Sequence, residues 1–124
     1  MAYQNYKNLQ VWQYSMDFVV KAYVLLEKFP PKEQYALTEQ LRRSLVSIPS
    51  NIAEGHGRTT TNDFLRFLNI SHGSLNEAET QFILAMRLNY ISPSEFDEVS
   101  NMINSISKML YKLKNSFQPI PQKQ

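Results

Sequence analysis

Hydrophobic residues recur every three or four positions along most of this chain, a spacing that indicates α-helices rather than strands. Four such segments are separated by short stretches rich in proline, glycine, serine or threonine. The expected helices span residues 8–29, 32–55, 61–89 and 93–117. Short connections between long helices make them antiparallel neighbours. The pattern therefore predicts an all-α, up-and-down antiparallel four-helix bundle, in a single domain over residues 1–124 with an extended tail over 118–124.

Each segment carries an apolar stripe that we expect to face the bundle core. In the first two segments the stripes are Leu9, Trp12, Met16, Val19, Tyr23 and Leu26, then Leu37, Leu41, Leu45, Ile48 and Ile52. In the last two they are Phe64, Leu68, Ser71, Leu75, Ala78, Phe82 and Ala85, then Phe96, Val99, Ile103, Ile106, Leu110, Leu113 and Phe117.

Several residues indicate where these helices begin. Pro31 is suited to the start of the second helix, because an early proline loses no N–H that the helix needs. Thr60 or Thr61 can cap the third helix with its hydroxyl. The run from Ser92 to Glu95 has the form of a capping box with proline at the first helical position.

Pro49 lies inside the second apolar stripe. A proline there removes one helical hydrogen bond and clashes with the carbonyl of Leu45, which costs about 3 kcal/mol unless something compensates. Ser44, Ser47 and Asn51 can bond the freed carbonyl region. We therefore predict that the second helix is kinked near Pro49.

The chain has three glycines, and two of them follow the second stripe. Gly55 and Gly57 are expected to mark the end of the second helix. Gly73, together with Ser74 and Ala78, is expected to allow another helix to approach the third helix closely.

The first helix has more apolar residues than one stripe can hold. Between Val11 and Leu26 they cover most of its circumference, and a helix that is apolar all round must be buried on several sides. Because a four-helix bundle buries only one side of each helix, we expect a homo-oligomer to cover the rest. The candidate oligomer interface consists of Trp12, Tyr14, Phe18 and Tyr23.

Composition narrows the class of protein. Cysteine is absent, so disulfides and thiolate metal sites are excluded. The polar beginning of the chain shows no secretion signal, and its apolar runs are too short for a membrane span. We expect a protein of the cytoplasm without a membrane-spanning segment. No spacing of histidines and carboxylates indicates a metal site, a cofactor or a catalytic centre, so we predict that the protein is not an enzyme.

The net charge is only +2, but the chain has no acidic residue after Glu98. A local excess of positive charge is typical either of a solvated helix face or of a surface that binds RNA. The candidate nucleic-acid-binding residues are Arg42, Arg43, Arg58, Lys108, Lys112 and Lys114. A second polar set could form a network between helices or subunits, or a small-ligand site. It consists of Ser47, Asn51, Glu54, Arg66, Ser74 and Glu77.

Five short motifs resemble those of the proteins encoded in intervening sequences of bacterial 23S rRNA genes, a family also labelled as ribosomal proteins. The resemblance covers about residues 5–115. The motifs are Tyr6–Trp12, Ser47–Gly55, Phe64–Leu68, Gly73–Glu77 and Asn89–Ile91.

This resemblance implies an up-and-down four-helix bundle assembled as a ring-like homopentamer. A relative that accompanies retroelements binds a reverse transcriptase and nucleic acid, but it is strongly basic. Two functions therefore remain open. One is a homo-oligomeric scaffold that binds RNA or a nucleic-acid enzyme, and the other is a structural or protein-interaction oligomer with no nucleic-acid role.

Overall fold

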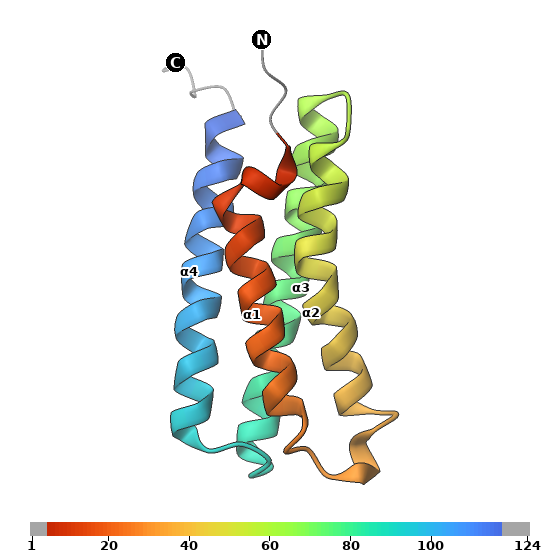
Figure 1. Ribbon diagram of the computed structural model, residues 1–124, viewed down its shortest axis with the longest axis vertical. Helices are drawn as coiled ribbons and strands as arrows, with labels where there is room; N and C mark the ends of the chain where they lie inside the picture. The colour runs from red at the N-terminus through yellow and green to blue at the C-terminus, as the bar shows by residue number, and fades with distance from the viewer. Residues whose placement is uncertain (1–4, 118–124) are drawn as a thin grey trace, which may run out of the picture.

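The structure, a computed structural model, describes residues 5–117 and forms four α-helices in that range. They are α1 (Gln10–Leu26), α2 (Leu37–His56), α3 (Thr61–Arg87) and α4 (Pro93–Phe117). Short 3-10 helices at Tyr6–Asn8 and Pro31–Glu33 precede α1 and α2. Neighbouring helices run in opposite directions, and residues 5–117 contain no strand (Figure 1). The predicted all-α, up-and-down bundle is confirmed, while the expected extended tail at 118–124 lies outside the described residues.

The four helices form a ring around one core. α1 and α3 each pack against both α2 and α4, and the contact between α2 and α3 is the most extensive. The predicted core stripe of α3 is buried along its whole length, and Leu41, Leu45, Ile48 and Ile52 of α2 are fully buried. Within the described part of the chain, no helix is long and apolar enough to cross a membrane.

The predicted core stripe of α1 is only partly correct. Leu26 is buried and Leu9, Trp12 and Val19 pack partly buried against the core, whereas Met16 and Tyr23 are exposed. The side chains that face the core also include Val11, Phe18 and Ala22. Because α1 carries apolar residues on adjacent faces, two stripes about 100° apart were both compatible with helical spacing. The one that packs inward holds the smaller Ala22 and Ser15, which let α1 lie close to the other helices.

The start of α2 also differs from the prediction, which placed it at residue 32. Pro31 begins only a 3-10 turn, and Ala36, with φ −123° and ψ −106°, interrupts the helical path before Leu37. The carboxylate of Glu33 accepts hydrogen bonds from the Leu37 N–H at 3.2 Å and from the Tyr90 hydroxyl at 2.7 Å. The Tyr90 bond, followed by the Leu37 bond, lowers the pKa of Glu33.

The starts of α3 and α4 follow their predicted caps. The Thr60 hydroxyl accepts a hydrogen bond from the Asp63 N–H at 3.1 Å. Ser92 and Glu95 bond reciprocally: the Ser92 N–H donates to the Glu95 carboxylate at 2.8 Å, and the Glu95 N–H donates to the Ser92 hydroxyl at 3.0 Å. Both caps satisfy backbone N–H groups that have no partner within the helix.

The end of α3 falls at Arg87, two residues before the predicted 89. Asn89 has φ +64°, and its N–H bonds the Met86 carbonyl at 3.0 Å. The Tyr90 N–H bonds the Ala85 carbonyl at 2.8 Å. These two bonds form a Schellman motif, in which asparagine takes the left-handed position more often occupied by glycine. The first helix is also shorter than the predicted 8–29, because its flanking turns are 3-10 or irregular.

Helix α2 continues through the buried Pro49. Two carbonyls just before the proline accept side-chain hydrogen bonds: the Asn51 amide donates to the Ser47 carbonyl at 2.8 Å, and the Ser71 hydroxyl donates to the Ile48 carbonyl at 2.8 Å. The carbonyl that loses its helical donor to Pro49 is that of Leu45, four residues earlier, so these bonds hold the neighbouring backbone without replacing the missing bond. The kink near Pro49 stays a prediction.

The close approach of helices lies at Gly55 and not at Gly73. Gly55 is inside α2, and a Cβ placed there would lie 2.6 Å from the Cβ of Phe67 on α3. A Cβ at Gly73 would meet nothing within 4 Å. The expectation that Gly73 permits close packing is therefore wrong, because this residue faces outward.

We predict opposite effects for the same substitution at these two glycines. Gly55→Ala forces a collision with a Cβ that cannot move without its backbone, and should lower the free energy of unfolding by about 1–2 kcal/mol. Gly73→Ala should raise it by about 0.5–1 kcal/mol, because alanine is the better helix former. Urea unfolding followed by circular dichroism measures both. Equal stabilisation by the two changes would contradict the close packing at Gly55.

Candidate functional site

A strip of exposed apolar side chains runs along α1 and the adjoining side of α2. The exposed fractions are 39% for Met16, 67% for Val20, 36% for Tyr23 and 57% for Val24 on α1, and 45% for Val46 on α2. We call these five residues the α1–α2 face. Single exposed apolar residues are common on monomeric proteins, but a contiguous strip is typical of an interaction surface.

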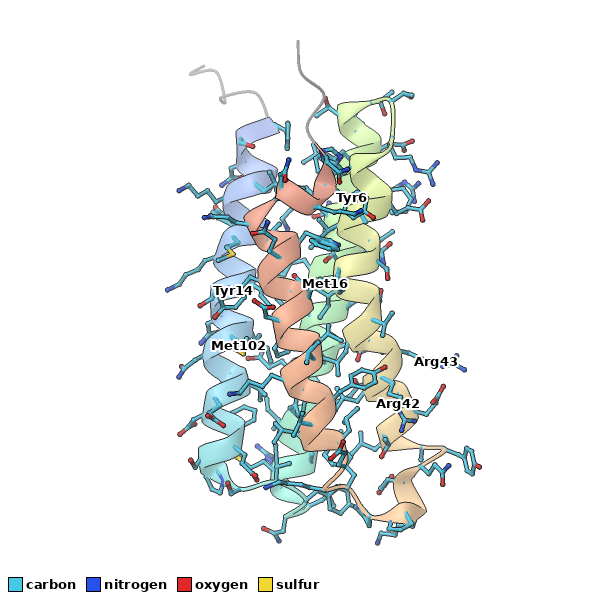
Figure 2. The ribbon with its side chains drawn as sticks, in the orientation of Figure 1. Tyr6, Tyr14, Met16, Arg42, Arg43 and Met102 are labelled. Carbon is cyan, nitrogen blue, oxygen red and sulfur yellow. The ribbon has the colours of Figure 1, made fainter. Side chains whose placement is uncertain are left out.

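Part of the α1–α2 face is hollowed by a groove of about 380 Å³ between the two helices. Trp12 and Met16 line it from α1, and Val46 and Pro49 line it from α2. Tyr6 lies at one end, with its ring edge-on to Trp12 and the ring centroids 5.3 Å apart (Figure 2). The groove is therefore walled mainly by apolar side chains and is open to solvent.

The predicted interface residues do not share one surface. Trp12 and Tyr23 line grooves between α1 and α2, whereas Tyr14 lies on the α4 side of α1, near Met102 (Figure 2). Phe18 is fully buried in the bundle core. Its assignment to the oligomer interface is therefore wrong, because a side chain that fills the subunit's own core has no surface left for a partner.

The most exposed part of this face is not among the predicted interface residues. Met16, Val20 and Val24 follow one another at intervals of four residues, so they stand in a row on one side of α1. Val46 continues the row onto α2. The four-residue spacing of this row is visible in the sequence, but it does not show which side of α1 faces outward. The burial of Phe18 in the core fixes the inward side of α1 and so places the row on the outward side.

The predicted polar set separates into three groups. Ser47 bonds Ser74 across α2 and α3 with 2.7 Å between the hydroxyl oxygens, and the Asn51 amide donates to the Ser47 hydroxyl at 2.8 Å. Glu77 lies beside Ser47 and Ser74 in a polar groove of about 280 Å³. The two remaining members form separate ion pairs: Glu54 at the end of α2 pairs with Arg58, just beyond the helix, at 3.0 Å, and Arg66 pairs with Asp63 within α3 at 3.6 Å.

A buried polar contact between α2 and α3 was not predicted. The Ser44 hydroxyl donates to the Gln81 side-chain carbonyl at 2.6 Å, and both residues are buried. Gln81 could not be singled out from the sequence, because glutamine is ordinary on a solvated helix face. Together with the Ser47–Ser74 and Ser71–Ile48 bonds, this contact forms a row of polar links between two packed helices.

The six candidate cations do not form one patch. Arg42 and Arg43 both pair with Glu39, at 3.5 Å and 3.1 Å, and Arg58 pairs with Glu54 (Figure 2 shows the first two on α2). The three lysines lie on α4, where Lys114 turns toward α3. The structure therefore supports no continuous RNA-binding surface made of all six residues.

His72 and Ser107 are close enough to act as a general base and a nucleophile, because 2.9 Å separates Nε2 from the hydroxyl oxygen. Lys114 Nζ lies 2.8 Å from the other ring nitrogen, Nδ1. Because an ammonium group only donates, Nδ1 is the acceptor, and the ring proton is on Nε2. The ring then has no free lone pair with which to take a proton from Ser107, so this pair is not arranged for nucleophilic catalysis.

Metal-binding chemistry finds no support in the described part of the chain. Residues 5–117 contain no group of three or more His, Cys, Asp or Glu side chains that could hold a metal ion.

The described residues form a small helical-bundle protein with an exposed apolar face. Residues 7–112 match the family described as 23S rRNA-intervening sequence protein, and the chain belongs to this family. A solved structure is also similar, that of a protein of unknown function from the S23 ribosomal protein family of Bacteroides thetaiotaomicron. Its TM-score is 0.78 and its identity 28%, over 84% of this chain and 97% of that one. No curated protein matches the chain.

The Ser44–Gln81 contact generates a prediction about stability. Ser44→Ala leaves the buried Gln81 carbonyl without its donor and should lower the free energy of unfolding by about 1–3 kcal/mol. Adding Gln81→Leu should recover part of that loss, because the unpaired polar group is then gone. Ser105→Ala is the matched control, since that exposed hydroxyl bonds only its own helix. Unfolding in urea measures all three, and equal stability of the Ser44 and Ser105 variants would contradict the role of the contact.

Proposed function

We propose that this protein is a non-enzymatic scaffold that assembles with copies of itself through the α1–α2 face. The observation that carries the proposal is the exposure of Met16, Val20, Tyr23 and Val24 on one helix. Removing apolar surface from water is worth roughly 25 cal/mol per Å², so a strip of this kind favours association. A second copy of the same chain is the partner that is always present at the required concentration.

The proposed number of copies is five, as the family resemblance implies. The apolar groove beside Trp12 supports an interlocking contact, because a groove accepts a ridge of side chains from its partner. A ring uses two different surfaces on each subunit, so the α1–α2 face would meet another part of the neighbouring copy.

Charge on the α1–α2 face should prevent assembly without unfolding the chain. Val20→Lys with Val24→Lys places two ammonium groups in the apolar strip, where burying them against a partner is costly. Lysine is a better helix former than valine, so α1 itself should persist. Sedimentation velocity should give the double variant the 14.5 kDa of one chain. The native protein should sediment as five copies.

The matched control adds the same charge elsewhere. Tyr35→Lys with Tyr111→Lys substitutes two side chains that are 86% and 62% exposed and lie outside the α1–α2 face. This variant should keep the native mass. If the Val20 and Val24 variant also keeps the native mass while its circular dichroism is unchanged, assembly does not use this face.

Binding of RNA or of a nucleic-acid enzyme stays a separate prediction. The best candidates for RNA contacts are Lys108 and Lys112, one turn apart on α4, because neither forms an ion pair among the described residues. Lys108→Glu with Lys112→Glu should reduce the retention of labelled single-stranded RNA on the immobilised protein, and added salt should do the same. If the native protein retains no RNA even at low salt, the prediction is wrong.

A further inference from the structure

Four polar side chains meet in the shallow space between α3 and α4. Lys114 Nζ lies 2.8 Å from His72 Nδ1 and 3.2 Å from the Asn69 side-chain oxygen. On the other side of the ring, His72 Nε2 lies 2.9 Å from the Ser107 hydroxyl. His72, Ser107 and Lys114 are half-buried and Asn69 is exposed, so solvent reaches the cluster. We call these four residues the α3–α4 cluster.

The α3–α4 cluster gathers positive charge without an opposite charge. Among the described residues, no carboxylate forms an ion pair with Lys114 or a hydrogen bond with His72. Burial, and then the nearby Lys114 charge, lower the pKa of His72. Burial also lowers the pKa of Lys114, against a smaller opposing effect of Tyr111. A negative charge added beside Lys114 and His72 would therefore be stabilised, because no carboxylate of the described residues already neutralises these two groups.

The hydrogen bonds of the cluster depend on a neutral imidazole. His72 Nδ1 accepts a proton from Lys114 only while it is unprotonated, and after protonation both atoms are donors. Two cationic donors 2.8 Å apart then need an acceptor between them or must separate. An oxyanion supplies that acceptor, because its oxygens can take hydrogen bonds from both groups at once.

We propose that the α3–α4 cluster binds a phosphate-type oxyanion between Lys114 and a protonated His72. The Asn69 amide and the Ser107 hydroxyl stand on either side of these two groups and provide neutral donors. The anion is either free phosphate or a phosphate group of a nucleic acid. The site lies on α3 and α4, on helices that do not form the α1–α2 face.

This site makes binding depend on pH in a defined direction. Affinity for the oxyanion rises as the pH falls through the folded-state pKa of His72, because the ring then adds a charge and a donor. Without the anion, there is a pH range in which the His72 ring is neutral in the folded chain but protonated in the unfolded chain, because folding lowers its pKa. The stability from the neutral His72–Lys114 pair is present above the unfolded-state pKa and is lost as the pH falls through the folded-state value.

NMR titration of the His72 ring signals tests the proposal. The titration is run in sodium chloride, in inorganic phosphate and with a ten-nucleotide single-stranded RNA, all at equal ionic strength. Phosphate should raise the pKa of His72 by about one unit relative to chloride. The same rise with RNA at a much lower concentration of phosphate groups would assign the site to nucleic acid, whereas no rise with RNA would assign it to free phosphate.

Two variants separate a binding site from a structural contact. Lys114→Gln should raise the pKa of His72 in chloride, because the repelling charge is gone, and should abolish the further rise with phosphate. Lys32→Gln removes the same charge in the 3-10 turn before α2, away from the cluster, and should behave as the native protein. If neither phosphate nor RNA moves the pKa of His72, or if His56 shifts by the same amount, the proposal is overturned.

Discussion

The structure depends on one constraint: α1 has apolar residues on more sides than its two neighbouring helices can cover. Phe18 and Ala22 fill the side toward the core, and Val20 and Val24 remain on the side toward water. A chain that buried both sides within itself would need a fifth helix. The exposed strip is therefore a consequence of the four-helix architecture, and the proposed assembly depends on it.

The other side of the bundle is organised differently. α2 and α3 approach closely at Gly55, and serine hydroxyls link them at Ser47 and Ser71. Polar links inside a packed interface fix the register of two helices more than they add to stability. The bundle thus combines a well-defined α2–α3 pair with an α1 that presents apolar side chains outward. A rigid pair behind the α1–α2 face would hold that face in one shape for its partner.

The sequence predicted those features that depend on local chemistry. The caps at Thr60 and Ser92 and the stripe of α3 were found, because they are set by neighbours three or four residues away. The inward side of α1 is only partly predicted, and the start of α2 is not. The first depends on which of two stripes fits the other helices. At the start of α2, the Glu33 carboxylate that accepts a bond from the Leu37 N–H also accepts one from Tyr90, 57 residues away. The Ser44–Gln81 contact and the α3–α4 cluster also arise only when helices meet.

The most direct test asks whether the α1–α2 face is covered in solution. The chain has no cysteine, so Val24→Cys and Tyr111→Cys each introduce a single reactive thiol. Both side chains are similarly exposed on one subunit, at 57% and 62%. If copies assemble through this face, a maleimide reagent should label Cys at 111 quickly and Cys at 24 slowly, and unfolding should abolish the difference. Equal labelling of the two folded variants would show that the apolar strip stands bare in water.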